Sequence, residues 1–324
     1  MKRTVLFLVA ALLCIQCLEA QPLQNQKDIF VFGYEGRTTV VTIPSGREGG
    51  GFLIQEGTVS GKSGVFQEAP IIHRYASQIV VGGNYRTHVL LGNPTSDSKT
   101  VMLDLSESTR GSMLVTLVME GIPGFPPLPA SSFMTTLKAG SAVAMTLLPL
   151  MSPEVVQAGW ADVSMTQTCS SDCADDITVQ VVYDIMDGTE VMGIVGVPAT
   201  ETGTEFWVNA QQTQTIGTGI AIVNPGPSDT TVTLEALGPI SIPVNGIPFA
   251  RVALTLRANN QMSRFVNEYM SADPNWATFL NLLSGDMSML GIRITSPTPV
   301  AVTALRTVSG KTFVIGGIPV HKRK

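Results

Sequence analysis

Short runs of apolar and β-branched residues recur along most of the chain, and clusters of Gly, Pro, Asn, Asp and Ser separate them. Each run has the length of a strand, and long stretches with the 3.6-residue period of a helix are nearly absent. This pattern is typical of a β-sandwich or barrel. Examples of the runs that we expect to form strands are residues 29–32, 38–43, 78–81, 88–91, 100–105, 178–183, 219–223, 230–234, 291–295 and 300–305.

Part of this pattern occurs twice. Residues 88–103 (HVLLGNPTSDSKTVML) align without gaps on residues 219–234 (GIAIVNPGPSDTTVTL), and both read as strand, Asn-Pro turn, polar loop and strand. An Asn before Pro is held extended and Pro cannot donate to a strand ladder, so the dipeptide ends a strand. Residues 137–140 (LKAG) correspond in the same way to residues 256–259 (LRAN). The repetition predicts two modules of one kind.

Each copy is also expected to contain one short helix. The first would start at Ser152 and stop at Gly159, and the second would start at Asp273 and stop at Gly285. Ser and Asp can cap free amide groups at a helix start, and a Pro follows each of them, where the first helical position tolerates it. Trp276 would lie on an apolar stripe of the second helix that docks onto the sandwich.

The expected fold is therefore all-β, with two tandem antiparallel β-sandwich modules (Ig-like or jelly-roll-like), each with one short helix. Modules of about 120–130 residues have a natural domain size. Residues 21–68 would form an N-terminal β segment, either separate or part of the first module. The expected division is a signal peptide at 1–20, the N-terminal segment at 21–68, module 1 at 69–200 and module 2 at 201–324.

The first twenty residues have the three parts of a secretory signal. Lys2 and Arg3 form a charged start, residues 5–15 an apolar stretch, and Ala20 a small residue at the cleavage position. The apolar stretch of about eleven residues is too short to cross a bilayer, which takes about 20. We therefore expect a secreted protein, extracellular, at the cell surface or periplasmic, with no integral membrane segment after signal removal.

Export affects the interpretation of the cysteines. Cys169 and Cys173 would remain after signal removal, and in an oxidising compartment they most simply form one local disulfide. Closing so short a loop should contribute about 2 kcal/mol. The C-x-x-x-C spacing does not match a redox motif, and no histidine lies nearby to complete a metal site. Asp172, Asp175 and Asp176 make the loop acidic, so weak calcium binding stays an open alternative.

The composition of the chain limits the classes of partner that it can bind. The chain has 324 residues, of which 44% are hydrophobic and 14% charged, with a net charge of −5. Enough apolar surface is available to bury a core, so a disordered chain is excluded. A nucleic-acid binder needs a basic surface, so we expect no nucleic-acid partner.

Several segments of the second copy also resemble repeats of known proteins. Residues 218–225 (TGIAIVNP), 263–268 (SRFVNE), 293–296 (RITS) and 299–306 (PVAVTALR) resemble repeats of secreted, often uncharacterised bacterial proteins with tandem β-sandwich modules. The resemblance covers most of residues 85–320. It implies the sandwich fold and carries over no catalytic residue.

A fainter similarity is to the repeats of IgGFc-binding-type mucosal proteins, through residues 203–208 (GTEFWV) and 292–302. The chain departs from that pattern in length and in its linking segments. Antibody binding is therefore not carried over.

The sequence shows no arrangement of residues that is typical of a catalytic site. A hydrolase triad needs a base beside a nucleophile, and the chain has only 3 histidines, His73, His88 and His321. His321 lies in the terminal tail, and the other two are expected to be structural or surface residues. The acids of residues 184–190 are interpreted as a solvated turn. We expect no enzyme activity, no metal site and no cofactor.

Exposed aromatic side chains are the candidates for sugar binding. Trp160 and Trp207 lie within expected strands and Trp276 on the apolar helix stripe, so we expect all three in the core. Tyr85, in the loop at residues 82–86, is the most plausible exposed aromatic residue. Tyr183 is a further candidate.

Loops at one end of a sandwich usually carry binding. The residues proposed to bind are Tyr85 and Arg86 in one loop and Asn93 and Asn224 in the two Asn-Pro loops. The leading hypothesis is a secreted, non-enzymatic surface or matrix protein whose modules bind a cell-surface glycan or protein, or act as spacers. The alternative is a secreted glycan-active enzyme or its accessory carbohydrate-binding module, which two facing carboxylates in a cleft would favour.

Overall fold

The computed structural model describes strands at residues 28–34, 37–43 and 53–57, and residues 71–322 apart from several gaps. The gaps are 110, 123–124, 167–176, 214, 238–249, 283–289, 309–313 and 319. The predicted signal peptide and the loop with Cys169, Cys173 and its three aspartates lie outside the described residues.

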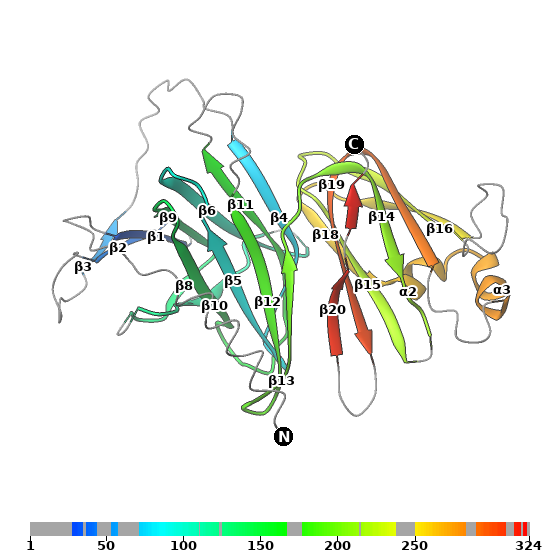
Figure 1. The fold of residues 1–324 in the computed structure, drawn as a ribbon, viewed down its shortest axis with the longest axis horizontal. Coiled ribbons are helices and arrows are strands. Elements are labelled where there is room, and N and C mark those ends of the chain that lie inside the picture. The colour runs from blue at the N-terminus through cyan, green and yellow to red at the C-terminus, as the bar shows by residue number, and fades with distance from the viewer. Residues whose placement is uncertain are drawn as a thin grey trace.

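Two antiparallel sheets form the first sandwich (Figure 1). The first sheet has the order β3–β2–β1–β9–β6–β11–β4, and the second has the order β13–β12–β5–β10–β7–β8. The strands of the first sheet are β1 Asp28–Tyr34, β2 Arg37–Ile43, β3 Leu53–Gly57, β4 Ile71–Val81, β6 Lys99–Glu107, β9 Ser132–Leu137 and β11 Gln157–Thr166. Those of the second sheet are β5 Tyr85–Gly92, β7 Val115–Met119, β8 Leu128–Ala130, β10 Ala142–Pro149, β12 Thr178–Asp187 and β13 Glu190–Pro198.

The remaining strands form the second sandwich. In one layer the order is β17–β16–β19–β14–β21, and in the other β15 lies between β18 and β19, with β20 on the far side of β19. The strands are β14 Gly203–Ala210, β15 Ile216–Asn224, β16 Thr230–Leu237, β17 Ala250–Leu256, β18 Asn260–Phe265, β19 Leu290–Val308, β20 Val314–Ile318 and β21 Val320–Lys322. The all-β prediction is confirmed.

The two sandwiches have equivalent strand pairings. In the first, β5 lies between β10 and β12, and β6 lies between β9 and β11. In the second, β15 lies between β18 and the C-terminal part of β19, and β16 lies between β17 and the N-terminal part of β19. The repeated hairpins of the sequence therefore occupy equivalent places.

One strand is longer than the sequence pattern predicts. Residues 291–295 and 300–305 were expected as two strands, but they belong to the single strand β19. Its first part pairs with β14 and β16 and its second part with β15 and β20, so β19 passes from one layer to the other. At the crossing, the Thr230 hydroxyl bonds to those of Ser296 and Thr298 over 3.0 and 2.7 Å.

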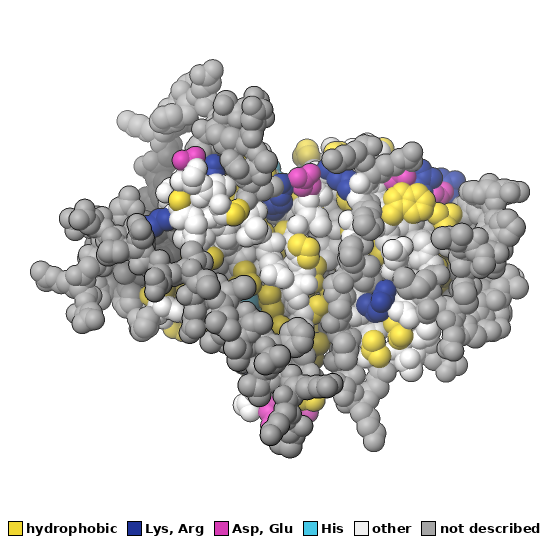
Figure 2. Space-filling model, viewed as in Figure 1, with side chains coloured by type: hydrophobic (Ala, Val, Ile, Leu, Met, Phe, Trp, Pro, Cys, Tyr) yellow, Lys and Arg dark blue, Asp and Glu magenta, His cyan; other side chains and the backbone are white. Residues whose placement is uncertain are grey.

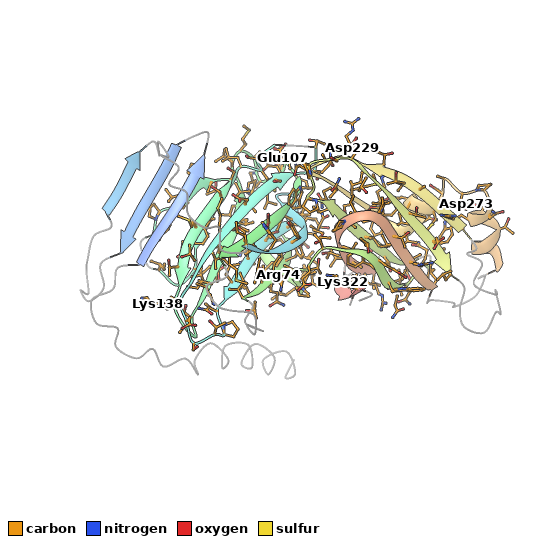
Figure 3. All side chains as sticks on the ribbon, turned by 90° about the horizontal axis from the view of Figure 1, so that it is seen from above. Arg74, Glu107, Lys138, Asp229, Asp273 and Lys322 are labelled. Carbon is orange, nitrogen blue, oxygen red and sulfur yellow. The ribbon has the colours of Figure 1, made fainter. Side chains whose placement is uncertain are left out.

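Each sandwich has its own apolar core. Leu91, Leu103 and Phe133 are among the fully buried side chains of the first core, and Phe206 and Leu234 belong to the second. Burying a side chain of this size contributes about 1.5–3 kcal/mol. Figure 3 shows side chains filling the space between the layers of each sandwich.

The helix predicted in the first copy is wrong. Residues 152–155 form a turn in which the Val155 amide donates to the Ser152 carbonyl over 3.1 Å, and β11 begins at Gln157. The Gly83 amide donates to the Pro153 carbonyl over 2.6 Å. The turn is held by the neighbouring β4–β5 loop, and strand β11 follows too soon for a helix to extend.

Within its described residues, the second copy contains α2 (Val266–Met270), which the sequence did not predict, and α3 (Asn275–Leu282). The Asp273 carboxylate accepts the Asn275 amide over 2.8 Å, as the predicted start of α3 requires. Trp276 is buried and its indole donates to Asn267 over 2.8 Å. Gly285, the expected stop, lies outside the described residues. None of the helices in the described ranges is long and apolar enough to cross a membrane.

Asn93 closes the first Asn-Pro loop from inside. Its side-chain amide donates to the carbonyls of Asp97, Leu137 and Lys138 over 2.7, 3.0 and 3.0 Å. Its side-chain oxygen accepts the Thr95 amide over 3.1 Å. One buried side chain thus ties the β5–β6 loop to the end of β9.

Asn224 does the same in the second sandwich. Its amide donates to the carbonyls of Ser228, Leu256 and Arg257 over 2.8, 3.3 and 3.1 Å, and its oxygen accepts the Gly226 amide over 3.0 Å. These backbone contacts match those of Asn93 one for one. The aligned sequences therefore encode the same buried loop closure twice.

Replacing Asn224 with Ala should destabilise the protein by about 2–4 kcal/mol, because three carbonyls and one amide lose their partner away from water. Urea denaturation would measure the loss. The matched control is Asn209→Ala on the exposed face of β14, which should change stability by less than about 0.5 kcal/mol. Equal effects of the two substitutions would contradict the assignment.

Candidate functional site

The two sandwiches meet directly after β13. The amide of Tyr75 donates to the Thr200 carbonyl over 2.8 Å, and the Thr200 amide donates back over 2.9 Å. Tyr75 and Trp160 of the first sandwich form a small buried cluster with Val223 and Ala301 of the second. Continuous backbone and apolar contacts therefore join the two sandwiches.

Polar groups reinforce this boundary. The Gln261 amide on β18 donates to the Gln78 side-chain oxygen over 2.7 Å and also to the Ser77 carbonyl. The Ser108 hydroxyl donates to Gln261 over 2.8 Å. Gln261 is 5% exposed, so one buried amide side chain reaches three residues of the first sandwich.

An ion-pair network lies at the outer edge of the boundary. Glu201 accepts from Arg74 over 2.9 Å and from Lys322 over 3.2 Å. The hydrogen bond from Lys322 and the charge of Arg74 lower the pKa of Glu201. Figure 3 shows Arg74 and Lys322 where the two sandwiches meet. On the face shown in Figure 2, described Lys and Arg side chains are scattered, several beside acidic ones.

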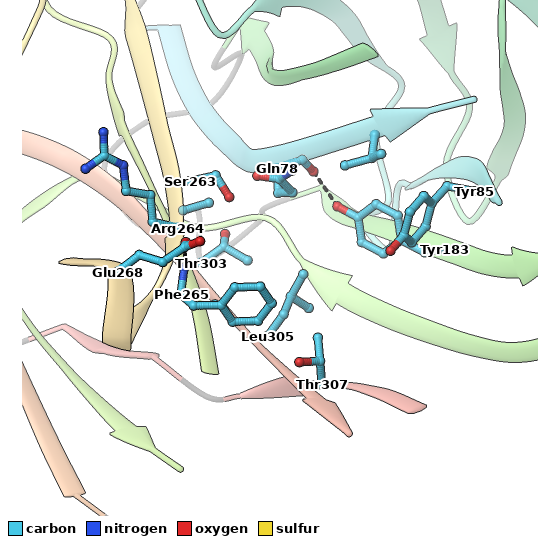
Figure 4. Close-up of a pocket in the computed structure, with 13 residues that line it drawn as sticks. Gln78, Tyr85, Tyr183, Ser263, Arg264, Phe265, Glu268, Thr303, Leu305 and Thr307 are labelled. Carbon is cyan, nitrogen blue, oxygen red and sulfur yellow. Dashed lines mark hydrogen bonds between the residues drawn. The ribbon is translucent and has the colours of Figure 1, made fainter. Parts of the chain in front are cut away.

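A cavity of about 240 Å³ lies between the sandwiches. Figure 4 shows Tyr85 and Tyr183 on one side of it and Ser263, Arg264 and Phe265 on the other. Its lining comes from both halves of the chain. The residues are Gln78, Val80, Tyr85 and Tyr183 from the first sandwich and Gly219, Ala221, Ser263, Arg264, Phe265, Glu268, Thr303, Leu305 and Thr307 from the second.

The wall from the second sandwich is the outer face of β18–β15–β19. Strand register puts Ser263 and Thr303 on either side of Ala221, and Phe265 and Leu305 on either side of Gly219. Residues that alternate along a strand share one face. Because the middle strand contributes only Ala and Gly, the face is hollow between its larger neighbours.

The wall from the first sandwich is aromatic. Tyr183 is buried and its hydroxyl donates to the Gln78 carbonyl. Burial raises the pKa of Tyr183, so the phenol stays neutral. Tyr85, the aromatic residue that the sequence singled out, is half-buried beside it.

Polar side chains of the second sandwich complete the lining, namely Ser263, Arg264, Glu268, Thr303 and Thr307. Thr303 is 4% exposed, and its hydroxyl has no hydrogen-bond partner among the described residues. Glu268 accepts the Phe265 amide over 2.8 Å, and the Arg264 guanidinium lies 6.0 Å from the centre of the Tyr269 ring. The Thr303 hydroxyl oxygen is itself shielded from the cavity, so the accessible polar groups are those of exposed residues such as Ser263, Arg264 and Glu268.

The other proposed binding residues lie elsewhere. Arg86 is on the outer face of β5, opposite Asp184 of β12. Asn93 and Asn224 are each 1% exposed, with their amide groups bonded to the backbone as described above. The structure therefore brings only Tyr85 of the four to the cavity.

The tryptophans differ from one another. The expected burial of Trp160 and Trp276 is confirmed. The prediction that Trp207 packs in the core is wrong. Phe206 and Val208 face the core, so the alternation of side chains along β14 turns Trp207 outward. It is 36% exposed, with the Arg293 guanidinium 6.0 Å from its ring centre.

His88 belongs to an acidic network on the outer face of the first sandwich. Its Nδ1 lies 2.6 Å from Glu120 and its Nε2 3.0 Å from Asp184. Burial alone would raise the pKa of Glu120, but hydrogen bonds with Thr146 and His88 and the charge of Arg86 lower it. The sequence had placed Asp184 in a solvated turn, whereas it lies in β12 and the residue is 8% exposed.

This network does not amount to a nucleophile and its base. The Thr146 hydroxyl lies 3.0 Å from His88 Nδ1, but it donates to Glu120 over 2.5 Å. Nucleophilic catalysis would need the hydroxyl proton directed at the imidazole. The network instead cross-links neighbouring strands. Among the described residues, no group of three or more His, Cys, Asp and Glu side chains could hold a metal ion.

A second acidic cluster lies on the outer face of the other sheet. Asp104 of β6 and Asp162 of β11 are directly opposite in register. His73 Nδ1 lies 2.9 Å from Asp162, and its ring stacks on Tyr75 at 5.9 Å. Burial, helped by the charge of Asp162, raises the pKa of Asp104 to about 6, and burial also raises the pKa of Asp162.

We expect Asp104→Asn to stabilise the protein near pH 7 by about 1–2 kcal/mol, allowing for solvent screening. The folded state binds the Asp104 proton more tightly than the unfolded state, so this group destabilises the fold as pH rises from about 4 through 6. Urea denaturation across this range measures the slope. Asp187→Asn at the exposed end of β12 is the control, and an unchanged slope in Asp104→Asn would contradict the prediction.

Comparisons with known proteins add nothing to this geometry. No family model matches the chain, and no curated protein or solved structure matches it.

Sequence reasoning missed most of the cavity. Thr303, Phe265 and Glu268 lie in strand or helix segments whose pattern indicates structure alone. One signal was available, because Gly217, Gly219 and Ala221 alternate along a strand and so leave a face without large side chains. That signal indicates close approach of another segment, but not which one.

Proposed function

We propose that the protein is a secreted, non-enzymatic surface or matrix protein that binds a macromolecule, a glycan or another protein, through the cavity between its two sandwiches. The observation that carries the proposal is the cavity itself, which both sandwiches line with aromatic and apolar side chains and a few polar groups. Pockets with a mainly apolar wall and a few convergent polar groups are the usual form of a ligand site.

Preorganisation favours this use of the cavity. Gln261 and the cluster of Tyr75, Trp160, Val223 and Ala301 join the sandwiches next to the hollow. A site whose walls are already fixed loses less entropy on binding.

The lining favours binding over hydrolysis. Among the described residues that line the cavity, Glu268 alone has a carboxylate, and it already accepts a backbone amide. Glycoside hydrolysis requires two carboxylates on either side of the scissile bond. The cavity supplies one.

The glycan-active enzyme remains the second candidate because Asp104 and Asp162 face each other across β6 and β11. A carboxyl with a raised pKa beside another carboxylate is a general-acid arrangement. Neither residue lines the cavity. Release of reducing sugar that Asp162→Asn abolishes, and that Gly219→Val leaves intact, would favour this candidate.

Filling the cavity should abolish binding. A Cβ at Gly219 would meet its nearest neighbours at 3.9 Å, which is ordinary contact, so Gly219→Val can fold while its methyl groups occupy the hollow. We expect saturable binding of the purified protein to cell-wall fractions, insoluble polysaccharides or intact cells to fall at least tenfold in this variant.

Gly291→Val is the matched control. Gly291 is also a strand glycine whose added Cβ would meet its nearest atom at 3.8 Å, but it does not line the cavity. It should bind like the wild type. Saturable binding that survives Gly219→Val would refute the proposed site, and no saturable binding by the wild type would favour a spacer.

A further inference from the structure

We propose that the two sandwiches part locally about the segment between β13 and β14, and that unpartnered polar groups buried on their boundary favour this opening. The groups are the hydroxyls of Ser77 and Thr303 and the indole N–H of Trp160. The closed arrangement is the main state, and the open arrangement is a minor one. The inference goes beyond the proposed function and needs no ligand.

One short segment carries the chain from the first sandwich to the second. Strand β13 ends at Pro198 and β14 begins at Gly203, so the segment consists of residues 199–202. Among the described strands, none of one sandwich shares a sheet with a strand of the other (Figure 1). Hinges are usually a few residues at the ends of elements. The connection therefore permits the sandwiches to move as separate bodies.

The apolar contact across the boundary is limited. The buried cluster that Trp160 forms with Tyr75 and two residues of the second sandwich is separate from the two large cores. Domains whose interface is neither large nor strongly hydrophobic ordinarily move relative to one another. Closure therefore also depends on polar contacts, such as the hydrogen bond from Gln261 to Gln78.

Three polar side-chain groups on this boundary have no hydrogen-bond partner among the described residues. Trp160 belongs to the bridging cluster, Thr303 lies on the face of β19 that meets the first sandwich, and the Ser77 carbonyl accepts from Gln261. Each of the three residues is at most 5% exposed, and the polar atom of each has less than 1 Å² of accessible surface. A molecule in the cavity therefore does not reach these atoms.

The missing partners weaken closure. A buried polar group without a hydrogen bond loses the hydration that it has in water and gains nothing in exchange. In the closed state this cost persists whatever occupies the cavity. When the sandwiches part, water reaches all three groups and the cost disappears. The apolar cluster and Gln261 favour the closed state, and the three polar groups favour the open one.

Opening also changes the cavity. Because residues of both sandwiches line it, parting them turns a small hollow into a cleft that a longer chain can enter. A ligand that contacts both walls binds the closed state better, since it loses one wall when the sandwiches part. The hinge therefore couples ligand entry to closure.

Thiol labelling under native conditions tests the opening. The 4 native cysteines are first replaced with Ser. Ala301→Cys then places a thiol in the boundary cluster, and Ala304→Cys is the matched control in the core of the second sandwich. The two alanines lie on the same strand and are both 0% exposed. We expect the thiol at position 301 to react at least tenfold faster, because the boundary opens without unfolding of either sandwich. Equal rates would overturn the proposal.

Thr303→Val and Ser77→Ala test the cause of the opening. Each removes an unpartnered hydroxyl and keeps most of the shape of the side chain, so each should slow labelling of the thiol at position 301 about fivefold. Thr231→Val, at an exposed position of β16, is the control and should leave the rate unchanged. If both variants label at the original rate or faster, the hydroxyls do not oppose closure and the proposal is refuted.

Discussion

Packing of the β18–β15–β19 face against the first sandwich is the contact on which the rest of the arrangement depends. Where that face is covered, Val223 and Ala301 join Tyr75 and Trp160 in a buried cluster. Further along the same face, the small residues Gly219 and Ala221 do not fill the space between the sandwiches, and this leaves the cavity. One sheet face therefore supplies both the cohesion between the two halves and the opening between them.

The equivalent face of the first sandwich explains the divergence of the two copies. His88 aligns with Gly219, and strand register places it between Thr146 and Val182 as Gly219 is placed between Phe265 and Leu305. There the face carries Glu120 and Asp184 around His88. A polar network suits a face near water, whereas a face that meets another sandwich requires small or apolar residues. The same fold thus uses one face for two purposes.

Much of the fold could be predicted because it depends on local signals. Alternating apolar residues marked the strands, and the Asn-Pro dipeptides marked loops that Asn93 and Asn224 close in the same way. Prediction failed where distant segments decide the outcome. The turn after Ser152 looks like a helix start until the β4–β5 loop takes its carbonyl, and Trp207 was misplaced because its size was weighed above the alternation of its strand. Tyr85 was predicted to be exposed but is half-buried in the cavity lining, and the sequence did not indicate the residues around it.

The sequence by itself determined the all-β class, the internal repetition and the positions of most strands, because propensity, turn chemistry and the period of two are properties of neighbouring residues. Only the tertiary structure decided that residues 221, 265 and 303 share one wall, since they lie on three strands joined by register rather than by sequence distance. It also decided that Thr303 is buried without a partner. Whether a polar atom is satisfied depends on every segment packed around it, and that information is not local.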